Sequence, residues 1–220
     1  MSRINIAIDG PSAAGKSTIA KNIAKRLGYV HLDTGAMYRS IGLKCRLENV
    51  DYTNDEEMLK LLANTDIVLT ADGKIFLDGK DVSMEIRTNE SSMWASNVST
   101  REVVRKDLVA RQQKMASAKG FVMDGRDIGT VVLKDAELKI FQTASVEARA
   151  KRRCLENASK GIEADYDKIY REIELRDYQD THRECSPLTQ AEDAVLLDTS
   201  DMSIDEVTEA ILNLVEEKVK

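Results

Sequence analysis

Short apolar runs alternate along most of the chain with stretches in which apolar residues recur every three or four positions. The short runs predict strands at residues 4–8, 29–32, 121–123, 138–141 and 194–197. The periodic stretches predict helices at 15–27, 36–48, 146–160, 166–183 and 203–219, the last opened by Ser203 and Glu206 at capping-box spacing. This alternation predicts an α/β fold, in which helices cover both faces of a parallel sheet. Ligands of such sheets bind beyond the carboxyl ends of the strands.

Residues 64–119 interrupt the alternation. Three short β-prone runs at 66–71, 74–77 and 80–82 are separated by the pairs Asp72-Gly73 and Asp78-Gly79. Asp-Gly between such runs is typical of tight hairpin turns, so we expect a small antiparallel sheet here. Two helices follow in the prediction, the second opened by Ser99 and Glu102 at capping-box spacing. The segment therefore resembles an inserted lobe rather than a separate domain.

The first predicted strand leads directly into a G-x-x-x-x-G-K-S motif at residues 10–17. Its glycines permit a tight turn whose peptide N–H groups converge at the N-terminus of the next helix and can bind phosphate. Lys16 adds a cation for the outer phosphates, and the Ser17 hydroxyl is suited to meet Mg²⁺. A glycine turn that merely joins a strand to a helix is the alternative, but the apolar repeat at 19–27 favours a phosphate loop. We therefore predict that the chain binds a nucleoside triphosphate.

The composition of the chain limits the classes of partner that it can bind. Its net charge of −6, from 32 basic and 38 acidic residues, argues against a general nucleic-acid binder. No run of eighteen apolar residues occurs, so we expect no membrane span. The three cysteines have no metal-ligand spacing, which favours a reducing, cytoplasmic location. Positive charge gathers instead at 149–153, where four cations fall within five residues; alone, such a run usually forms a solvated helix face.

A phosphate loop does not by itself distinguish a kinase from a switch GTPase or a motor. The guanine-reading motif Asn-Lys-x-Asp is missing from the sequence, and 220 residues are few for a motor. A small-molecule kinase needs a second site for its acceptor, and three polar clusters are candidates: 32–39, 124–130, and the group Arg176, Asp180 and Arg183, which helical spacing places on one face. Their structural alternatives are a helix cap by Asp33 or Thr34, a tight turn with a surface Arg–Asp pair, and surface salt bridges.

Together these residues resemble the bacterial cytidylate kinase family, which has the nucleoside monophosphate kinase fold. The resemblance rests on IAIDGPSAAGKST, LDTGAMYR, DGKDVSMEIRT, DGRDIGTVV, the basic run at 149–153 and LRDYQDTHR, and it extends from residue 4 to about 200. It implies a single P-loop kinase domain with a core at about 1–63, 120–148 and 185–220. It also implies a nucleoside-monophosphate-binding insert at about 64–119 and a lid at about 149–165.

The resemblance implies transfer of the γ-phosphoryl group of ATP to CMP or dCMP, with Mg²⁺ as cofactor. The implied ATP site comprises Gly10, Pro11, Ser12, Ala13, Ala14, Gly15, Lys16, Ser17 and Thr18, together with Arg149 and Arg152 on the lid. The implied CMP site comprises Thr34, Ser96, Arg105 and Asp127 around cytosine, Arg176 and Asp180 at the ribose, and Arg39, Arg126 and Arg183 at the phosphate. Lys16, Arg126, Arg153 and Arg183 would be catalytic, and Ser17 and Asp33 would meet Mg²⁺ directly or through water.

The residue types suit this chemistry. Cytosine presents an exocyclic amine, which a carboxylate such as Asp127 can accept, beside acceptor atoms that Arg105 can bind. Uracil would place a carbonyl against Asp127, at a cost of at least about 1–3 kcal/mol. Some members of the family carry serine where this chain has Thr34, so the hydroxyl group at this position is kept.

Two other hypotheses remain open: a kinase of the same fold with another acceptor, such as shikimate or dephospho-coenzyme A, and an ATP-binding regulatory module without transferase activity. We expect a cytoplasmic monomer that acts on small molecules, not on nucleic acid or membranes.

Overall fold

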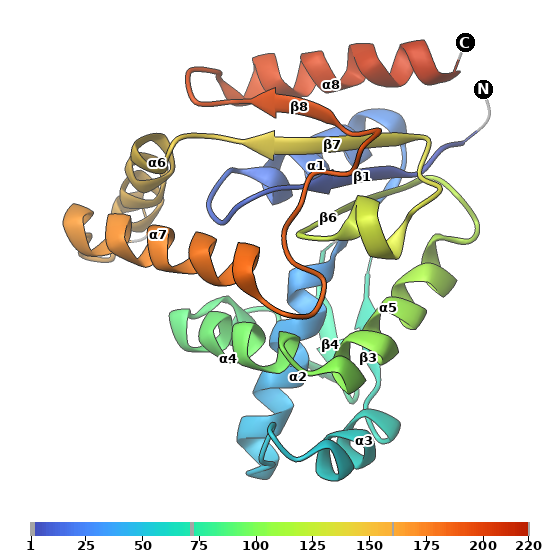
Figure 1. The fold of residues 1–220 in the computed structure, drawn as a ribbon, viewed down its shortest axis with the longest axis vertical. Helices are drawn as coiled ribbons and strands as arrows, with labels where there is room; N and C mark the ends of the chain where they lie inside the picture. Colours follow the sequence, from blue (N-terminus) through green and yellow to red (C-terminus); the bar gives the residue numbers. More distant parts are fainter. Residues whose placement is uncertain (1–2, 71–72, 160, 220) are drawn as a thin grey trace. The chain divides into compact units, whose positions relative to one another are not determined.

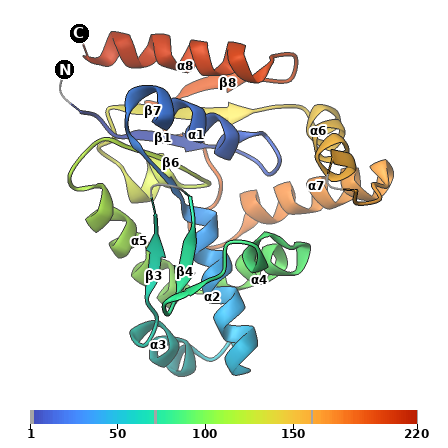
Figure 2. The same cartoon turned by 180° about the vertical axis from the view of Figure 1, so that it is seen from behind.

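The computed structural model describes residues 3–70, 73–159 and 161–219. The chain forms two compact units, one of Met1–Tyr29 with Lys119–Lys220 and one of Val30–Ala118 (Figures 1 and 2). The division into core, insert and lid expected from the sequence stays a prediction.

The first unit contains most of a parallel sheet. Its central strand β1 (Ile6–Asp9) pairs in parallel with β6 (Phe121–Gly125) and with β7 (Leu138–Thr143), and β7 pairs in parallel with β8 (Val195–Asp198). Within the first unit these strands lie in the order β6-β1-β7-β8, and the remaining parallel-sheet strand, β2 (Val30–Asp33), belongs to the second unit. Every residue of β1 is buried, as in a strand covered on both faces. The predicted α/β class with a parallel sheet flanked by helices is confirmed.

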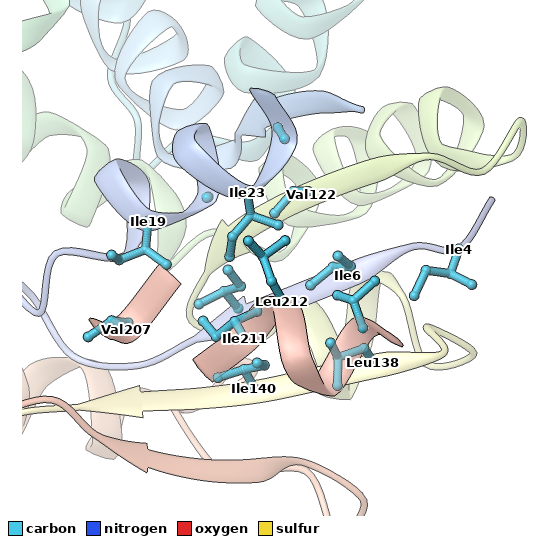
Figure 3. Packing of buried hydrophobic residues seen from close by; sticks show 14 residues of the cluster. Ile4, Ile6, Ile19, Ile23, Val122, Leu138, Ile140, Val207, Ile211 and Leu212 are labelled. Carbon is cyan, nitrogen blue, oxygen red and sulfur yellow. The ribbon is translucent and has the colours of Figure 1, made fainter. Parts of the chain in front are cut away.

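Helices α1 (Lys16–Leu27) and α8 (Ile204–Val219) pack on this sheet and on each other. Figure 3 shows the resulting core, in which Ile6 of β1 and Ile140 of β7 meet Ile23 of α1 and Ile211 of α8. Each such side chain contributes about 1.5–3 kcal/mol when fully buried. At the start of α8, Ser203 Oγ accepts the Glu206 N–H at 3.2 Å and Glu206 Oε2 accepts the Ser203 N–H at 2.8 Å, which confirms the capping box.

The first unit is completed by a π-helical turn, η2 (Ile128–Val132), and by a helix pair, α6 (Val146–Ser159) and α7 (Tyr166–His182). Ala150 of α6 packs between Ile169 and Ile173 of α7, and Ala13 of the phosphate loop lies against this small cluster. The helix pair is thereby joined to the segment that follows β1.

The second unit holds a three-stranded antiparallel sheet of β3 (Ile67–Leu69), β4 (Ile75–Leu77) and β5 (Lys80–Asp81). Leu77 faces Lys80 across the turn, and Asp78 and Gly79 both have positive φ, so the predicted Asp-Gly hairpin is confirmed there. The first predicted turn includes Asp72, which lies outside the described residues. The predicted small antiparallel sheet is nevertheless confirmed by the β3–β4 pairing.

The helices of the second unit are α2 (Thr34–Glu48), α3 (Asp55–Ala63), the 3₁₀ turn η1 (Glu85–Arg87), α4 (Asn89–Ser99) and α5 (Glu102–Ala116). Helices α2 and α4 pack closely at Gly42, where an added Cβ would lie 2.7 Å from Trp94 Cβ. Any larger residue there would push the two helices apart.

Four details differ from the sequence-based expectations. Ser99 does not open α5, because it ends α4 and its hydroxyl donates to the Ser96 carbonyl; Arg101 is the N-cap and makes no side-chain cap bond. Arg183 lies just beyond α7 in extended conformation, so the three polar residues do not share one helix face. β1 begins at Ile6, since the Asn5 side chain accepts the Phe121 N–H.

The fourth difference is α3, which the hydrophobic pattern did not predict. Asn54 caps it by accepting the N–H groups of Glu56 and Glu57, and three acidic residues occupy its first turn, where they complement the helix dipole.

Residue 160, the predicted end of α6, lies outside the described residues. Cys45, Cys154 and Cys185 carry free thiols. In the described ranges, none of the helices combines the length and apolar character needed to cross a bilayer.

Candidate active site

The loop between β1 and α1 has the backbone of a phosphate loop. Gly10, Ala13 and Gly15 have φ of 149°, 58° and 88°, the region that glycine adopts without strain. Gly10 is also fixed by space, because an added Cβ would lie 1.9 Å from the Gln142 carbonyl oxygen of β7. The first glycine of the motif is therefore required both for its dihedral angles and for close backbone approach.

Three side chains hold carbonyl groups of this loop. Lys16 Nζ donates to the Pro11 oxygen at 2.7 Å, Arg149 Nη1 to the Ser12 oxygen at 3.0 Å, and Gln142 Nε2 to the Ala14 oxygen at 2.6 Å. Gln142 is 1% exposed, and its Oε1 has no partner. With three of its carbonyls held by donors from α1, α6 and β7, the shape of the loop is supported by the protein itself.

Charged side chains near the carboxyl ends of the strands influence one another's pKa values. Burial lowers the pKa of the Lys16 ammonium well below its usual range; Arg126 lowers it further, and Asp124 opposes the shift. At the end of β6, Asp124 Oδ2 accepts a 2.6 Å hydrogen bond from Ser17 Oγ. A hydroxyl and a carboxylate at hydrogen-bond distance form a pair of oxygen ligands of the kind that Mg²⁺ uses.

Arg126 and Asp180 form a partly buried ion pair in which Arg126 Nε lies 2.6 Å from Asp180 Oδ2. Burial alone would raise the pKa of the Asp180 carboxyl, but Arg126 outweighs it and holds that pKa below its usual range. Burial likewise opposes the charge of Arg126, yet Asp180 and Asp124 raise the pKa of its guanidinium. The pair thus joins the loop after β6 to the C-terminal turn of α7.

In the sequence, Asp127 lies between Arg126 of this ion pair and Ile128, the first residue of η2. Its carboxyl is buried, and Arg183 Nη2 lies 3.7 Å from Asp127 Oδ1. The next two N–H groups, of Ile128 and Gly129, donate to the two carboxylate oxygens of Asp9 at 2.8 and 2.7 Å. The structure therefore brings Arg126, Asp127, Asp180 and Arg183 together, and Arg126 pairs with Asp180 rather than with its neighbour Asp127.

The basic run on α6 divides into side chains with different contacts. Arg149 is buried and makes a two-pronged ion pair with Asp177, with contacts of 3.0 and 2.5 Å, and its Nε donates to the Ala144 carbonyl. Arg152 donates to the Thr199 carbonyl beyond β8. Arg153 is partly exposed and pairs with Glu156 at 3.1 Å. Of the three, Arg149 and Arg152 have most of their donors engaged by the protein itself.

In the second unit, the residues at the start of α2 form their own cluster. Asp33 caps α2 by accepting the Ala36 N–H at 2.9 Å, and its other oxygen accepts from Arg39 at 2.9 Å. The Arg105 guanidinium of α5 lies 5.8 Å from the centre of the Tyr38 ring, within range of a cation–π contact. Thr34 and Arg105 are buried. Ser96 lies on α4 and is half-buried.

The sequence matches the model of the family described as cytidylate kinase over residues 6–217. The chain belongs to the cytidylate kinase family. It is 52% identical over 217 residues to a cytidylate kinase of Caldicellulosiruptor saccharolyticus, covering 97% of this chain and 96% of that protein. It is 51% identical over 219 residues to a cytidylate kinase of Bacillus subtilis, covering 98% of each. The resemblance inferred from the motifs is thereby confirmed.

A solved structure of an uncharacterized protein from Eubacterium ventriosum has the same fold, with a TM-score of 0.55 and 13% identity, covering 97% of this chain and 99% of that one. At this identity the likeness concerns the fold alone.

Sequence reasoning missed three residues that support the cytidylate kinase motifs: Asp9, Gln142 and Asp177. Each contacts a motif residue far away in the chain, through an ion pair or through hydrogen bonds to main-chain groups. Asp9 could have been noticed as a charged residue that ends a wholly apolar strand, and Asp177 as a member of LRDYQDTHR. Nothing in the local sequence marks Gln142.

Proposed function

We infer that this protein transfers the γ-phosphoryl group of ATP to CMP or dCMP, giving ADP and CDP or dCDP, in pyrimidine nucleotide metabolism. The observation that carries this inference is the family match over residues 6–217, in a chain whose phosphate loop is built around Lys16. The roles of individual residues below are our proposals.

The phosphates of ATP bind the loop from Gly10 to Thr18. Its carbonyl groups at Pro11, Ser12 and Ala14 are held by side chains, which supports a loop whose N–H groups serve the anion. Arg149 acts here through the loop, because its guanidinium already holds Ser12 and Asp177. Arg153 is the arginine of α6 that is best placed to reach ATP directly, since its side chain is 38% exposed.

Mg²⁺ is the expected cofactor, and the oxygen donors present fit it. In the described ranges, no group of three or more His, Cys, Asp and Glu side chains forms a metal cage. The pair Ser17–Asp124 provides a hydroxyl and a carboxylate, which suits an ion that keeps waters and binds substrate phosphates. When bound, Mg²⁺ supplies neutralising charge to the phosphates. Asp33, the other proposed ligand, already caps α2 and pairs with Arg39, so the geometry favours Asp124.

The cytosine of CMP is read by Asp127 and Arg105, with Thr34 and Ser96 as hydroxyl partners. Burial of Asp127 and Arg105 supports discrimination, because an unmatched polar group costs more away from water. Arg176 and Asp180 meet the ribose, and Arg39, Arg126 and Arg183 bind the acceptor phosphate. Arg126 is held by Asp180, which keeps its guanidinium charged and oriented.

The reaction is a direct in-line displacement in which an oxygen of the CMP phosphate attacks the γ-phosphorus of ATP. Both reactants are anions, so the residues act mainly by neutralising charge and aligning the two groups. Lys16, Arg126, Arg153 and Arg183 provide this charge. An ionised phosphate monoester is itself the nucleophile, so no strong general base is needed. We also propose that the protein is a cytoplasmic monomer; size-exclusion chromatography with light scattering tests the monomeric state.

An acceptor screen tests the activity. With Mg-ATP, the protein should form ADP rapidly with CMP or dCMP and slowly with UMP or AMP. Equal rates with all four would reject the base-reading assignment, and transfer to shikimate or dephospho-coenzyme A instead would point to another kinase. ATP binding without transfer to any acceptor would indicate a regulatory module.

The variant Asp127→Ala tests the proposed base reader within the same assay. We expect its preference for CMP over UMP to fall at least about tenfold, because the carboxylate that distinguishes amine from carbonyl is lost. Asp135→Asn, at an exposed position in the loop after η2, is the matched control and should keep the preference.

A further inference from the structure

Asp9 is a buried carboxylate that the transfer chemistry does not use. It ends β1, is 5% exposed, and directly precedes Gly10 of the phosphate loop. Its Oδ1 accepts the N–H of Ile128 at 2.8 Å, and its Oδ2 accepts the N–H of Gly129 at 2.7 Å. One carboxylate thus binds two successive peptide groups of a loop more than a hundred residues away in the chain.

These two peptide groups follow directly after Asp127. The carbonyl of Asp127 in turn accepts the N–H groups of Val131 and Val132, which closes the turn η2. The loop is also closely packed at Gly129, where an added Cβ would lie 3.2 Å from Lys139 Cδ and 3.4 Å from Asp9 Oδ2. The backbone at Asp127 therefore has little room to move while Asp9 holds the next two residues.

We propose that Asp9 is a positioning residue for base recognition: it fixes the main chain after Asp127 and thereby sets the Asp127 carboxylate in the orientation that distinguishes cytosine from uracil. This proposal rests on the proposed function, in which Asp127 reads the base. Asp9 acts through Asp127 and does not itself touch the nucleotide. A displacement of about 1 Å at such a group can cost about a hundredfold in rate, so its support matters as much as its identity.

Two features make a purely structural role for Asp9 insufficient. An ionised carboxylate is costly to bury, and an apolar residue at the end of a buried strand would serve the core better. Its two acceptors also match the two adjacent donors, which is a geometry that sets the position of a loop. Among charged groups, Asp127 and Lys16 act on Asp9, and the stem of Lys139 packs beside the same loop with its ammonium on Asp193.

The variant Asp9→Asn tests the proposal, because asparagine keeps one acceptor oxygen and replaces the other with a donor. Glu137→Gln is the matched control: Glu137 also accepts a main-chain N–H, that of Asn5, which directly precedes the first residue of β1, at 2.9 Å. We expect Asp9→Asn to weaken CMP binding and to lower the kcat/KM preference for CMP over UMP, each by about tenfold. ATP binding, measured separately by calorimetry, should change less than about threefold, since Asp9 acts on Lys16 less than Arg126 and Asp124 do.

A readout independent of activity is amide hydrogen exchange. In Asp9→Asn, the amide of Ile128 or Gly129 should exchange faster, while those of Val131 and Val132 change little. Glu137→Gln should leave the CMP preference and both amides unchanged.

A folded Asp9→Asn protein that keeps the wild-type preference overturns the proposal, and so does a loss of ATP affinity as large as that of CMP affinity. If Asp9→Asn does not fold, Gly129→Ala decides: its methyl group crowds Asp9 and Lys139, and we expect a preference about threefold lower, whereas an unchanged preference overturns the proposal. A wild-type protein that does not prefer CMP to UMP would instead remove the proposed function itself.

Discussion

Burial shifts the pKa values of two charged residues around the phosphate loop, Asp9 and Lys16, in opposite directions. Burial raises the pKa of the Asp9 carboxyl from 3.8 to about 6 and lowers the pKa of the Lys16 ammonium well below its usual range. In both cases burial shifts the protonation equilibrium toward the neutral form, since a low-dielectric site penalises charge of either sign. The phosphates of ATP would reverse the shift of Lys16, so binding of ATP and protonation of Lys16 should be coupled.

The first residue-scale prediction concerns Lys16→Ala. We expect a loss of about 3–4 kcal/mol of transition-state stabilisation, or several hundredfold in kcat, because a preorganised cation at the transferred group is removed. Stability should change little, since the buried ammonium is itself costly. Steady-state kinetics with a thermal melt measures both. Lys21→Ala, at an exposed site on the same helix, is the control, and near-normal turnover in Lys16→Ala would remove Lys16 from the mechanism.

The second residue-scale prediction concerns the pH dependence of the free energy of unfolding. Since the pKa of Asp9 rises from 3.8 to about 6 on folding, the folded protein binds more protons between these values, and stability from this group is lost as pH rises through about 6. The stability of Asp9→Asn relative to wild type should therefore increase from pH 4 to pH 7, by up to about 3 kcal/mol. Urea unfolding at several pH values measures it, and a constant difference would refute the shift.

At the scale of elements, the ion pair Arg149–Asp177 joins α6 to α7 and also reaches the phosphate loop through the Ser12 carbonyl. The helix pair therefore supports the phosphate loop through the Arg149 guanidinium, which the Asp177 carboxylate orients. Outer-sphere groups orient metal ligands in the same way. Arg152 fixes α6 at its other side, on the turn after β8.

This arrangement predicts that Asp177→Asn weakens ATP binding by about three- to tenfold, because one charged prong of the pair is lost and Arg149 no longer holds Ser12 as firmly. CMP affinity measured without ATP should stay within about twofold of wild type. Calorimetry with each nucleotide measures this, with Glu174→Gln at an exposed site on α7 as control. Equal losses for both nucleotides would contradict the proposed path through the loop.

Elements and motifs could be predicted to the extent that local sequence determines them. Apolar periodicity indicated the parallel strands and five helices, and Asp78-Gly79 indicated a hairpin. The pattern failed at α3, whose evidence lay in the Asn54 cap rather than in its apolar stripe, and at Ser99, whose spacing from Glu102 was coincidental. For the candidate site, Lys16 and Asp127 could be singled out from their motifs and their roles stay predictions, whereas the partners of Arg126 and Arg149 depend on tertiary packing that no local pattern encodes.

For the whole molecule, the acidic net charge of −6 contrasts with the arginines gathered around the phosphate loop and η2. Bound anions should therefore stabilise the folded chain, because they relieve repulsion among buried or half-buried guanidinium groups as well as adding contacts. The effect should depend on the nucleotide rather than on negative charge in general.

The corresponding prediction is a thermal shift. CMP at a hundred times its Kd should stabilise the protein by about 2.7 kcal/mol, which for a chain of this size is an increase of about 5–10 °C in Tm. UMP at the same concentration should give a clearly smaller increase, and inorganic phosphate the smallest. Differential scanning fluorimetry without ATP measures this, and equal shifts with CMP and UMP would speak against base recognition in the binary complex.

The three side chains that grip the backbone carbonyls of residues 11, 12 and 14 bear on protein engineering. Two of them, Gln142 and Arg149, come from β7 and α6, well outside the octapeptide that defines the motif. A peptide copied from residues 10–17, or the same letters grafted onto a foreign strand–helix junction, would lack these outside braces. Such a peptide or graft should therefore adopt many conformations and bind polyphosphate weakly. The conformation that binds phosphate depends on the tertiary structure around the motif as well as on the motif sequence.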